Sequence, residues 1–130
     1  MNEHTSQGLS ERLRDKGFRG EHEIVWIKTD GEWIRCNAVL ASMFRGAIPA
    51  YTFSELWAVM PSIIPTEYGD IELDMYKEGN SGPTICVYWD VIEHTQESTF
   101  IRHESPAEAI GEMLIWLIEN NYYEVNNAKT

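Results

Sequence analysis

Several features that define other protein classes are missing from this sequence of 130 residues. No apolar run approaches the roughly 18 residues of a membrane span, and the polar N-terminus lacks the apolar segment of a signal peptide. The sequence therefore predicts a cytoplasmic protein without a membrane segment. The two cysteines, Cys36 and Cys86, lie fifty residues apart without paired ligand spacing. We interpret both as buried thiols, with a disulfide or a metal pair as the alternatives.

Signatures of catalysis and of cofactor binding are also missing. The sequence contains no phosphate-binding loop of the Walker or dinucleotide type, no nucleophile elbow and no zinc-protease motif. Ser81 and Gly82 fall in a predicted loop between two strands, without the strand–turn–helix setting that a nucleophile or a phosphate cradle needs. We therefore predict no cofactor and favour a non-enzymatic protein.

Basic residues are scarce, and their distribution is uneven. The chain carries 10 Lys and Arg against 21 Asp and Glu, which gives a formal net charge of -11. Residues 1–36 are close to balance, with six basic and seven acidic side chains, whereas residues 37–130 carry four and fourteen. An acidic body repels phosphate backbones, so direct nucleic-acid binding is disfavoured. Such a surface suits either solubility alone or a basic protein partner.

Residues 105–121 predict the helix around which the fold is organised. Ser105, Pro106 and Glu108 form a capping box with proline at the first helical position. At about 100° per residue, the apolar side chains of this helix cover more of its circumference than contact with one sheet requires. Three glutamates share one narrow arc that we expect to face water: Glu108, Glu112 and Glu119.

The width of the apolar arc predicts that a second surface covers this helix. Gly111, Trp116 and Ile118 are the interface candidates on it. The covering surface is either another part of the chain, such as the helix after Thr52 or the first hairpin, or a second copy of the protein. A homodimer is therefore one of the two expectations.

The N-terminal third predicts a short helix. Residues 1–8 lack periodicity and are expected to fray, as are residues 124–130. A helix is expected over Ser10–Lys16, ended by Gly17 in the left-handed conformation with Phe18 packed back on it. Its surroundings hold a basic cluster, which we interpret as a solvated face, with an anion or acidic partner as the alternative: Arg12, Arg14, Lys16 and Arg19.

Asp30 and Gly31 lie between two apolar runs, which indicates a β-hairpin with a type I′ turn. This turn predicts four cross-strand pairs: Val25–Cys36, Trp26–Arg35, Ile27–Ile34 and Lys28–Trp33. Trp26 and Trp33 then lie on the face away from the core, beside cations that can stack on them. These two indoles are further interface candidates, because they are either covered by another element or form a recognition surface.

The middle of the chain combines an ambiguous segment with a clear helix. Ala38–Phe44 fits either a third strand or a helical turn. Thr52 and Glu55 form a second capping box, and Pro61 ends the helix that follows, with Pro65 in a loop. The spacing of four apolar residues predicts one buried face on this helix: Phe53, Leu56, Trp57 and Met60.

The remaining segments predict a three-stranded antiparallel meander over residues 70–76, 84–93 and 99–103. The first strand alternates, with apolar residues inward and acids outward, and the second is apolar enough on both faces to lie centrally. With 43% apolar residues the chain suits one folded domain. The sequence thus predicts a single α+β domain over residues 1–130: short helix, hairpin, helix, meander, and a C-terminal helix packed on the sheet.

A turn centred on Gln96 and Glu97 places Asp90 opposite His103. Asp90, His94 and His103 then share one face of the sheet and form a candidate metal or acid–base site. The alternative is a polar strand edge, since a register slip of one residue disperses the group. A metal-dependent enzyme is accordingly a third functional hypothesis.

Two stretches, Ile48–Pro61 and Pro106–Asn120, together resemble a group of small uncharacterised proteins of phages and other bacterial mobile elements. Those proteins have a similar helix–meander–helix layout and a similar alanine-rich final helix. Gly111 stands where a larger apolar residue is expected in the group. The resemblance implies a bacterial or phage setting and no particular activity, because it concerns helix caps and core positions alone.

Two functional hypotheses follow from the sequence beside the metal-dependent enzyme. The first is a non-enzymatic interaction or accessory protein, expected as a homodimer. The second is an acidic inhibitor that occupies a basic, nucleic-acid-binding surface of a partner protein. The first rests on the apolar arc of the C-terminal helix, and the second rests on the acidic charge of residues 37–130.

Overall fold

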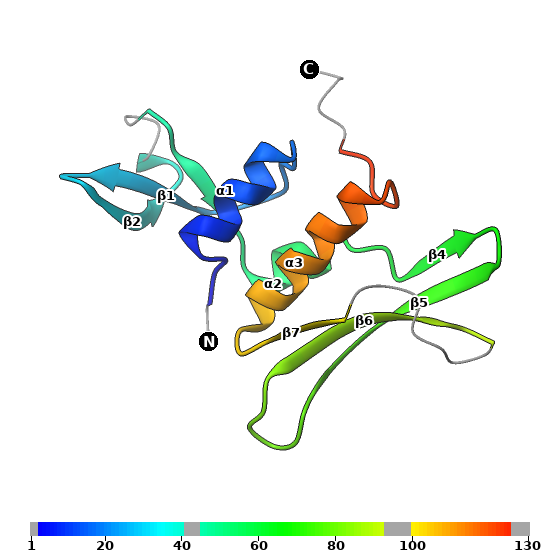
Figure 1. Cartoon of the computed structure of the whole chain (residues 1–130). Helices are drawn as coiled ribbons and strands as arrows, with labels where there is room; N and C mark the ends of the chain where they lie inside the picture. Colours follow the sequence, from blue (N-terminus) through cyan, green and yellow to red (C-terminus); the bar gives the residue numbers. More distant parts are fainter. Residues whose placement is uncertain (1–2, 41–44, 93–99, 126–130) are drawn as a thin grey trace.

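The protein is α+β, as predicted. The computed structural model describes residues 3–40, 45–92 and 100–125. Within these residues, three helices lie between a three-stranded and a four-stranded antiparallel sheet (Figure 1). The elements are α1 (Gln7–Asp15), β1 (Ile24–Thr29), β2 (Glu32–Asn37), β3 (Ile48–Ala50), α2 (Phe53–Trp57), β4 (Ile63–Thr66), β5 (Gly69–Lys77), β6 (Thr84–Asp90), β7 (Ile101–His103) and α3 (Pro106–Glu119). None of these helices is long and apolar enough to cross a bilayer.

The first hairpin forms in the predicted register. All four predicted pairs are present between β1 and β2. Asp30 and Gly31 have φ angles of 52° and 80°, the left-handed values that a type I′ turn requires. Lys28 Nζ lies 5.8 Å from the ring centroid of Trp33, and Arg35 Cζ lies 5.6 Å from that of Trp26. Both predicted cation–π contacts are therefore confirmed.

The hairpin has a small core of its own. Val25 and Ile27 are buried and pack with the partly buried Cys36, Ala38 and Ala47. The expected apolar face is only partly covered, because the Ile34 side chain opposite Ile27 remains 43% exposed.

Two strands that the sequence did not predict complete the sheets at their edges. β3 pairs with β1, so the first sheet has the order β2-β1-β3. β4 pairs with β5, so the second sheet has four strands, in the order β4-β5-β6-β7, instead of the expected three. Each of these strands contains a proline, Pro49 or Pro65. The sequence predicts a loop at Pro65, but an edge strand tolerates proline because its outer N–H groups need no partner in the sheet.

The four-stranded sheet has an inner face toward α3 and an outer face. The alternation predicted for β5 is present, and its buried Ile71 lies on the inner face. The pairing of β5 with β6 determines which face each of the other residues occupies. The inner face carries Ile71, Leu73, Met75, Cys86 and Tyr88. The outer face carries Asp70, Glu72, Asp74, Val87 and Trp89. β6 is central and buried from Thr84 to Tyr88, as its apolar sequence predicted.

The main core lies between this inner face and the helices. It is built largely from α3, whose buried residues include Ala109, Ile110, Met113, Leu114 and Leu117. The Tyr88 side chain is buried in this core, and its hydroxyl donates to the carbonyl of Pro61 at 2.7 Å. Side chains from α1, α2, β4 and β7 complete this core.

The N-terminal segment is ordered, so the expected fraying is wrong for residues 3–8. Ser6, and not Ser10, caps α1, and its hydroxyl accepts from the N–H of Leu9 at 3.2 Å. Thr5 is fully buried and donates its backbone N–H to the carbonyl of Tyr51 at 2.8 Å. The helix therefore begins before Ser10, the start expected from the sequence. Ser10 is buried within the helix, with its Oγ 2.6 Å from Thr5 Oγ1.

The C-terminal end of α1 follows the prediction. Gly17 has a φ of 88°, and its N–H donates to the carbonyl of Arg14 at 2.9 Å. The N–H of Phe18 donates to the carbonyl of Leu13 at 3.0 Å, which completes a Schellman motif. At the other terminus of the chain, Val125 is partly buried and packs on the core, against the expectation for residues 124–130, of which 126–130 lie outside the described residues.

Helix α2 begins as predicted but ends early. The capping box of Thr52 and Glu55 is complete. The helix stops at Trp57, which is 45% exposed, so the prediction that Trp57 shares the buried face is wrong. Ala38–Leu40 form a turn. The rest of the ambiguous segment, residues 41–44, lies outside the described residues.

Candidate functional site

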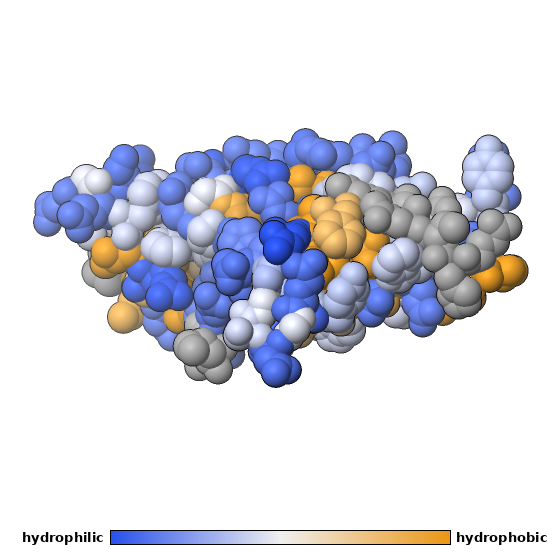
Figure 2. All heavy atoms as spheres, turned by 60° about the horizontal axis from the view of Figure 1, so that its bottom comes forward, coloured by the Kyte–Doolittle hydropathy of each residue, from blue (hydrophilic) through white to orange (hydrophobic). Residues whose placement is uncertain are grey.

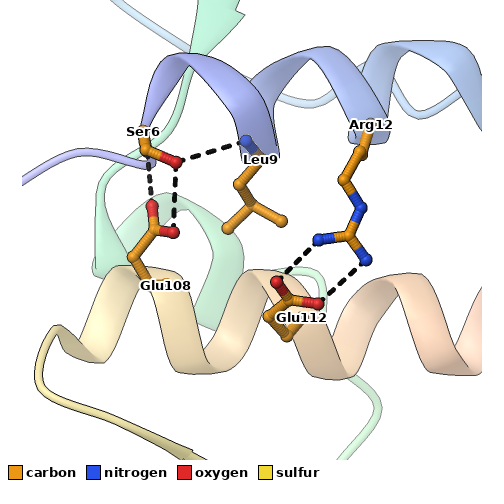
Figure 3. A network of polar contacts seen from close by, with 5 residues as sticks. All are labelled: Ser6, Leu9, Arg12, Glu108 and Glu112. Atoms are coloured by element: carbon orange, nitrogen blue, oxygen red, sulfur yellow. Dashed lines mark hydrogen bonds and ion pairs between the residues drawn. The ribbon is translucent and has the colours of Figure 1, made fainter.

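The glutamates of α3 contact α1 and its caps while they stay partly exposed to water. The two helices run side by side in the same direction (Figure 3). Glu108 does not reach back to its own N-cap. Its carboxylate accepts from the backbone N–H and the hydroxyl of Ser6, the latter at 3.1 Å. The N–H of Ser105 instead donates to His103 Nδ1 at 3.0 Å. Glu108 therefore caps the neighbouring helix, where its charge also favours the positive end of the helix dipole.

The basic cluster of α1 supplies the other partners. Arg12 donates to both carboxylate oxygens of Glu112, at 2.7 and 3.0 Å, and Lys16 Nζ lies 2.9 Å from a carboxylate oxygen of Glu119. The hydrogen-bonded carboxylate of Glu112 raises the pKa of Arg12 above its usual value. Both pairs are partly exposed, so each contributes at most about 1 kcal/mol. The interpretation of the cluster as a solvated face is wrong for these two residues.

Gly111 marks the closest approach of α1 to α3. A Cβ atom at this position would lie 2.6 Å from Leu9 Cδ2 and 3.5 Å from Thr5 Cγ2. Both neighbours are buried. The second surface over α3 is thus supplied by α1 and the N-terminal segment, which the sequence did not suggest, together with α2, the helix after Thr52 that it did suggest. Gly111 is covered within the chain and is not available to a partner.

The other four interface candidates are partly covered. Trp116 and Ile118 are half-buried against the core, and the ring of Trp116 lies 5.5 Å from that of Tyr122. Trp26 donates its indole N–H to the carbonyl of Thr5 at 3.0 Å, which ties the hairpin to the N-terminal segment. Trp33 is half-buried under Lys28.

The candidate metal site depended on a strand register that the structure does not have. His103 lies opposite Thr84 in the sheet, and not opposite Asp90. Thr84, the partner of His103, lies six residues from Asp90 along β6. At the rise of a β-strand, this places Asp90 and His103 about 20 Å apart in the strand direction. His94 lies outside the described residues. In the described part of the chain, no three His, Cys, Asp or Glu side chains are grouped so that they could hold a metal ion.

The outer face of the four-stranded sheet carries an acidic row from β5: Asp70, Glu72 and Asp74. All three are exposed. Within the described residues, none forms an ion pair. Asp74 accepts a hydrogen bond from the indole N–H of Trp89 at 3.1 Å, which fixes the indole on this face.

Apolar side chains accompany the acidic row. Ile63 on β4 is 51% exposed and Tyr76 on β5 is 40% exposed, and the pairing places both on the outer face. An open hollow of about 490 Å³ lies along the paired strands β5 and β6, lined by Glu72, Leu73, Asp74, Trp89, Asp90 and Val91. Figure 2, which brings the lower side of Figure 1 forward, shows apolar atoms gathered near the middle of the view, with hydrophilic atoms above and to the left of them. This combination suits contact with another macromolecule more than chemistry on a small substrate.

The thiols do not form a reactive centre. Burial raises the pKa of Cys86 to about 12, and the charge of Asp74 adds to this effect. Cys86 therefore remains protonated near neutral pH and is a poor nucleophile. Cys36 is partly exposed on β2, and both cysteines are free. Burial likewise raises the pKa of the Tyr88 phenol.

Comparisons with known proteins do not identify a relative. No protein-family model, no curated protein and no solved structure matches the chain.

Proposed function

We propose that this is a non-enzymatic accessory protein that binds a basic surface of another protein through the outer face of its four-stranded sheet. The observation that carries the proposal is the acidic row of Asp70, Glu72 and Asp74 on the outer sheet face, whose side chains are exposed and form no ion pair within the described residues. It combines the accessory role with the acidic-inhibitor role expected from the sequence.

The arrangement of charge within the chain supports this choice. Arg12, Arg14, Lys16 and Arg102 all form ion pairs with carboxylates of the same chain. Residues 63–92, which form β4 to β6 and their connections, contain six carboxylates and one lysine. The excess negative charge is therefore concentrated on one region and not spread evenly. Such a field steers basic partners and repels phosphate backbones.

Trp89, Tyr76 and Ile63 give the same face a contact surface. Aromatic residues are enriched in protein interfaces because they bury a large apolar area while keeping a polar group for hydrogen bonding. The Trp89 indole, held by Asp74, loses little conformational freedom on binding. A basic partner would satisfy the carboxylates while its apolar side chains cover these residues.

Several expectations from the sequence enter the proposal in different ways. The homodimer is not part of it, because α1 covers the arc of α3 that motivated a second copy. A cytoplasmic setting fits the two free thiols. A bacterial or phage origin comes only from the resemblance of the two helical stretches, and a partner with a basic nucleic-acid-binding surface suits such a setting.

The proposal is tested with an immobilised lysine-rich peptide and two variants of equal net charge. The triple variant D70N/E72Q/D74N removes the acidic row, whereas the control E21Q/E32Q/E124Q removes three exposed carboxylates elsewhere. We expect the parent and the control to bind alike, and the sheet variant to bind about tenfold more weakly or worse. Binding of the parent should weaken steeply between about 50 and 200 mM salt.

The comparison of the two triple variants shows whether the peptide binds at the outer face or responds only to the net charge of the protein. If the two triple variants lose the same affinity, binding depends only on net charge and the outer face is not the site. Salt-insensitive binding contradicts the electrostatic basis of the proposal.

A further inference from the structure

A second hollow lies at the other end of the β5–β6 hairpin, where the N-terminal segment, the start of α2 and the start of α3 meet. Its volume is about 850 Å³, within the range of small-molecule sites. We call it the α2–α3 hollow and define it by Glu3, Glu23, Phe53, Thr84 and Ala107, which all line it. It shares none of the residues that line the hollow on the outer sheet face.

The Thr84 hydroxyl is an unsatisfied hydrogen-bonding group in the lining of this hollow. The residue is 5% exposed, and its buried Oγ1 has no hydrogen-bond partner among the described residues. Burying a hydroxyl without a partner is unfavourable, so such groups are rare in folded proteins. Thr84 lies on the inner face between Lys77 and His103. The Nδ1 of His103 accepts from the N–H of Ser105, and His103 forms no hydrogen bond with Thr84 Oγ1. A ligand donor would supply the missing bond.

The charges around the hollow favour a cation. Among the described residues, Glu3, Glu23 and Glu55 line it together with one cation, Lys77. Glu55 is held in the capping box of α2 by the N–H of Thr52. Glu3 and Glu23 are exposed and form no ion pair within the described residues. Two carboxylates are therefore free to receive an ammonium group.

The walls of the hollow are apolar. Phe53 lines it and stacks on Trp57, with ring centroids 5.6 Å apart. Met75 and Pro106 contribute further apolar surface from β5 and α3. An aromatic face attracts cations and also packs against an apolar ligand. The ligand that satisfies both the walls and the rim has an apolar body and one positive charge.

We propose that the α2–α3 hollow binds a small organic cation, an amine with an aromatic or aliphatic body. The apolar body lies against Phe53 and Met75, the ammonium group meets Glu3 and Glu23, and an N–H of the ligand donates to Thr84 Oγ1. This inference does not depend on the proposed function of the outer sheet face.

The test uses phenethylamine as the probe, with phenethyl alcohol as its neutral analogue and phenylacetate as its anionic one. Two-dimensional amide NMR spectra of the full chain report binding residue by residue. We expect phenethylamine to shift the amides of residues that line the hollow, such as Phe53, Thr84 and Ala107. The alcohol should bind about tenfold more weakly, and phenylacetate should cause no shifts there.

Matched variants locate the contacts. Thr84→Val keeps the shape and removes the hydroxyl, and we expect it to fold and to bind phenethylamine about fivefold more weakly. Glu23→Gln should weaken binding by a similar factor, whereas Glu21→Gln, a nearby exposed carboxylate outside the hollow, should not. The D70N/E72Q/D74N variant should bind the amine as the parent does, which separates this site from the outer face.

Three results overturn the inference. The first is the absence of shifts at the lining residues with phenethylamine at millimolar concentration. The second is equal binding of the amine and the alcohol, because the carboxylates then have no role. The third is unchanged affinity in a folded Thr84→Val protein, which means that the hydroxyl is not a contact.

Discussion

Helix α3 and strand β5 each carry three acidic side chains on one face, at the spacing of their own secondary structure: Glu108, Glu112 and Glu119 on the helix, and Asp70, Glu72 and Asp74 on the strand. In composition the two rows are alike. In the structure every glutamate of α3 meets a group of α1, whereas the β5 row meets no cation within the described residues.

The difference shows that an acidic row has no fixed role. On α3 the carboxylates complement the N-terminus and the basic side chains of α1, so they stabilise the fold. On β5 the carboxylates lie about 7 Å apart on one face and repel one another, and within the described residues no cation offsets this repulsion. A row that slightly destabilises the isolated protein is better explained by binding than by folding, which supports the outer face as the candidate site.

The largest effect is expected where the two helices touch, at Gly111→Leu. The new side chain would overlap Leu9, since even a Cβ would lie 2.6 Å from Leu9 Cδ2. We expect α1 to shift away from α3 and the free energy of unfolding to fall by about 3 kcal/mol, as measured by urea denaturation. The α3 carboxylates would then lose their partners and resemble the β5 row.

Gly8→Leu is the control for this substitution. Nothing lies within 4 Å of a Cβ at Gly8, so the variant should be as stable as the parent or slightly more stable. Adding Leu9→Ala to Gly111→Leu should cost less than the sum of the single changes, because the smaller side chain makes room. An undisturbed Gly111→Leu protein would show that the helices are not in close contact.

The second prediction compares the rows directly through E108Q/E112Q/E119Q. Loss of the charge at the Ser6 cap and of two ion pairs should lower the free energy of unfolding by about 1–2 kcal/mol. The loss should shrink at high salt, which screens the charges in the parent. If the variant is as stable as the parent in low salt, the α3 row has no structural role and the contrast with β5 disappears.

The third prediction concerns the strongest single pair of the α3 row. A double-mutant cycle with Arg12→Gln and Glu112→Gln should give a coupling energy of about 0.5–1 kcal/mol, because two parallel hydrogen bonds join the side chains. The pair Arg102–Glu78 is the control, since Arg102 contacts only one oxygen of that carboxylate. Its coupling should be smaller, and a larger value would contradict the importance given to the α1–α3 contact.

The smallest effect on stability is expected from D70N/E72Q/D74N. Neutralising the β5 row should change the free energy of unfolding by no more than about 0.5 kcal/mol, with a gain in low salt because repulsion is removed. Thermal unfolding in low and high salt measures this change. A loss of more than about 1 kcal/mol would mean that these carboxylates stabilise the fold, as those of α3 do.

Turns and helix ends were predictable from the sequence because residues next to them in the chain determine them. The Asp30-Gly31 turn predicted the register of the first hairpin, because only one pairing suits a two-residue type I′ loop. Ser105, Thr52 and Gly17 predicted helix ends, because capping is decided within a few residues. The strand register between β6 and β7 was not predictable in this way, since residues 91–100 separate them and contain no short turn motif that selects one pairing.

The two missed strands and the missed helix start have a common cause. Pro49 and Pro65 are compatible with strands only because β3 and β4 are edges, and edge position depends on which strands pair. Ser6 functions as a cap in a segment that looks irregular by itself. Its order comes from Glu108, Tyr51 and Trp26, which are distant in sequence.

By itself the sequence determined the α+β class, the N-caps of α2 and α3, the hairpin register and the acid alternation of β5. Each of these follows from backbone geometry or hydrophobic spacing over a few residues. The tertiary structure decided what covers α3, which carboxylates are paired, and that Thr84 is buried without a partner beside a hollow. Those outcomes depend on contacts between residues as many as 102 positions apart, as with Ser6 and Glu108. Local spacing carries no information about such partners, because they are chosen by the packing of whole elements.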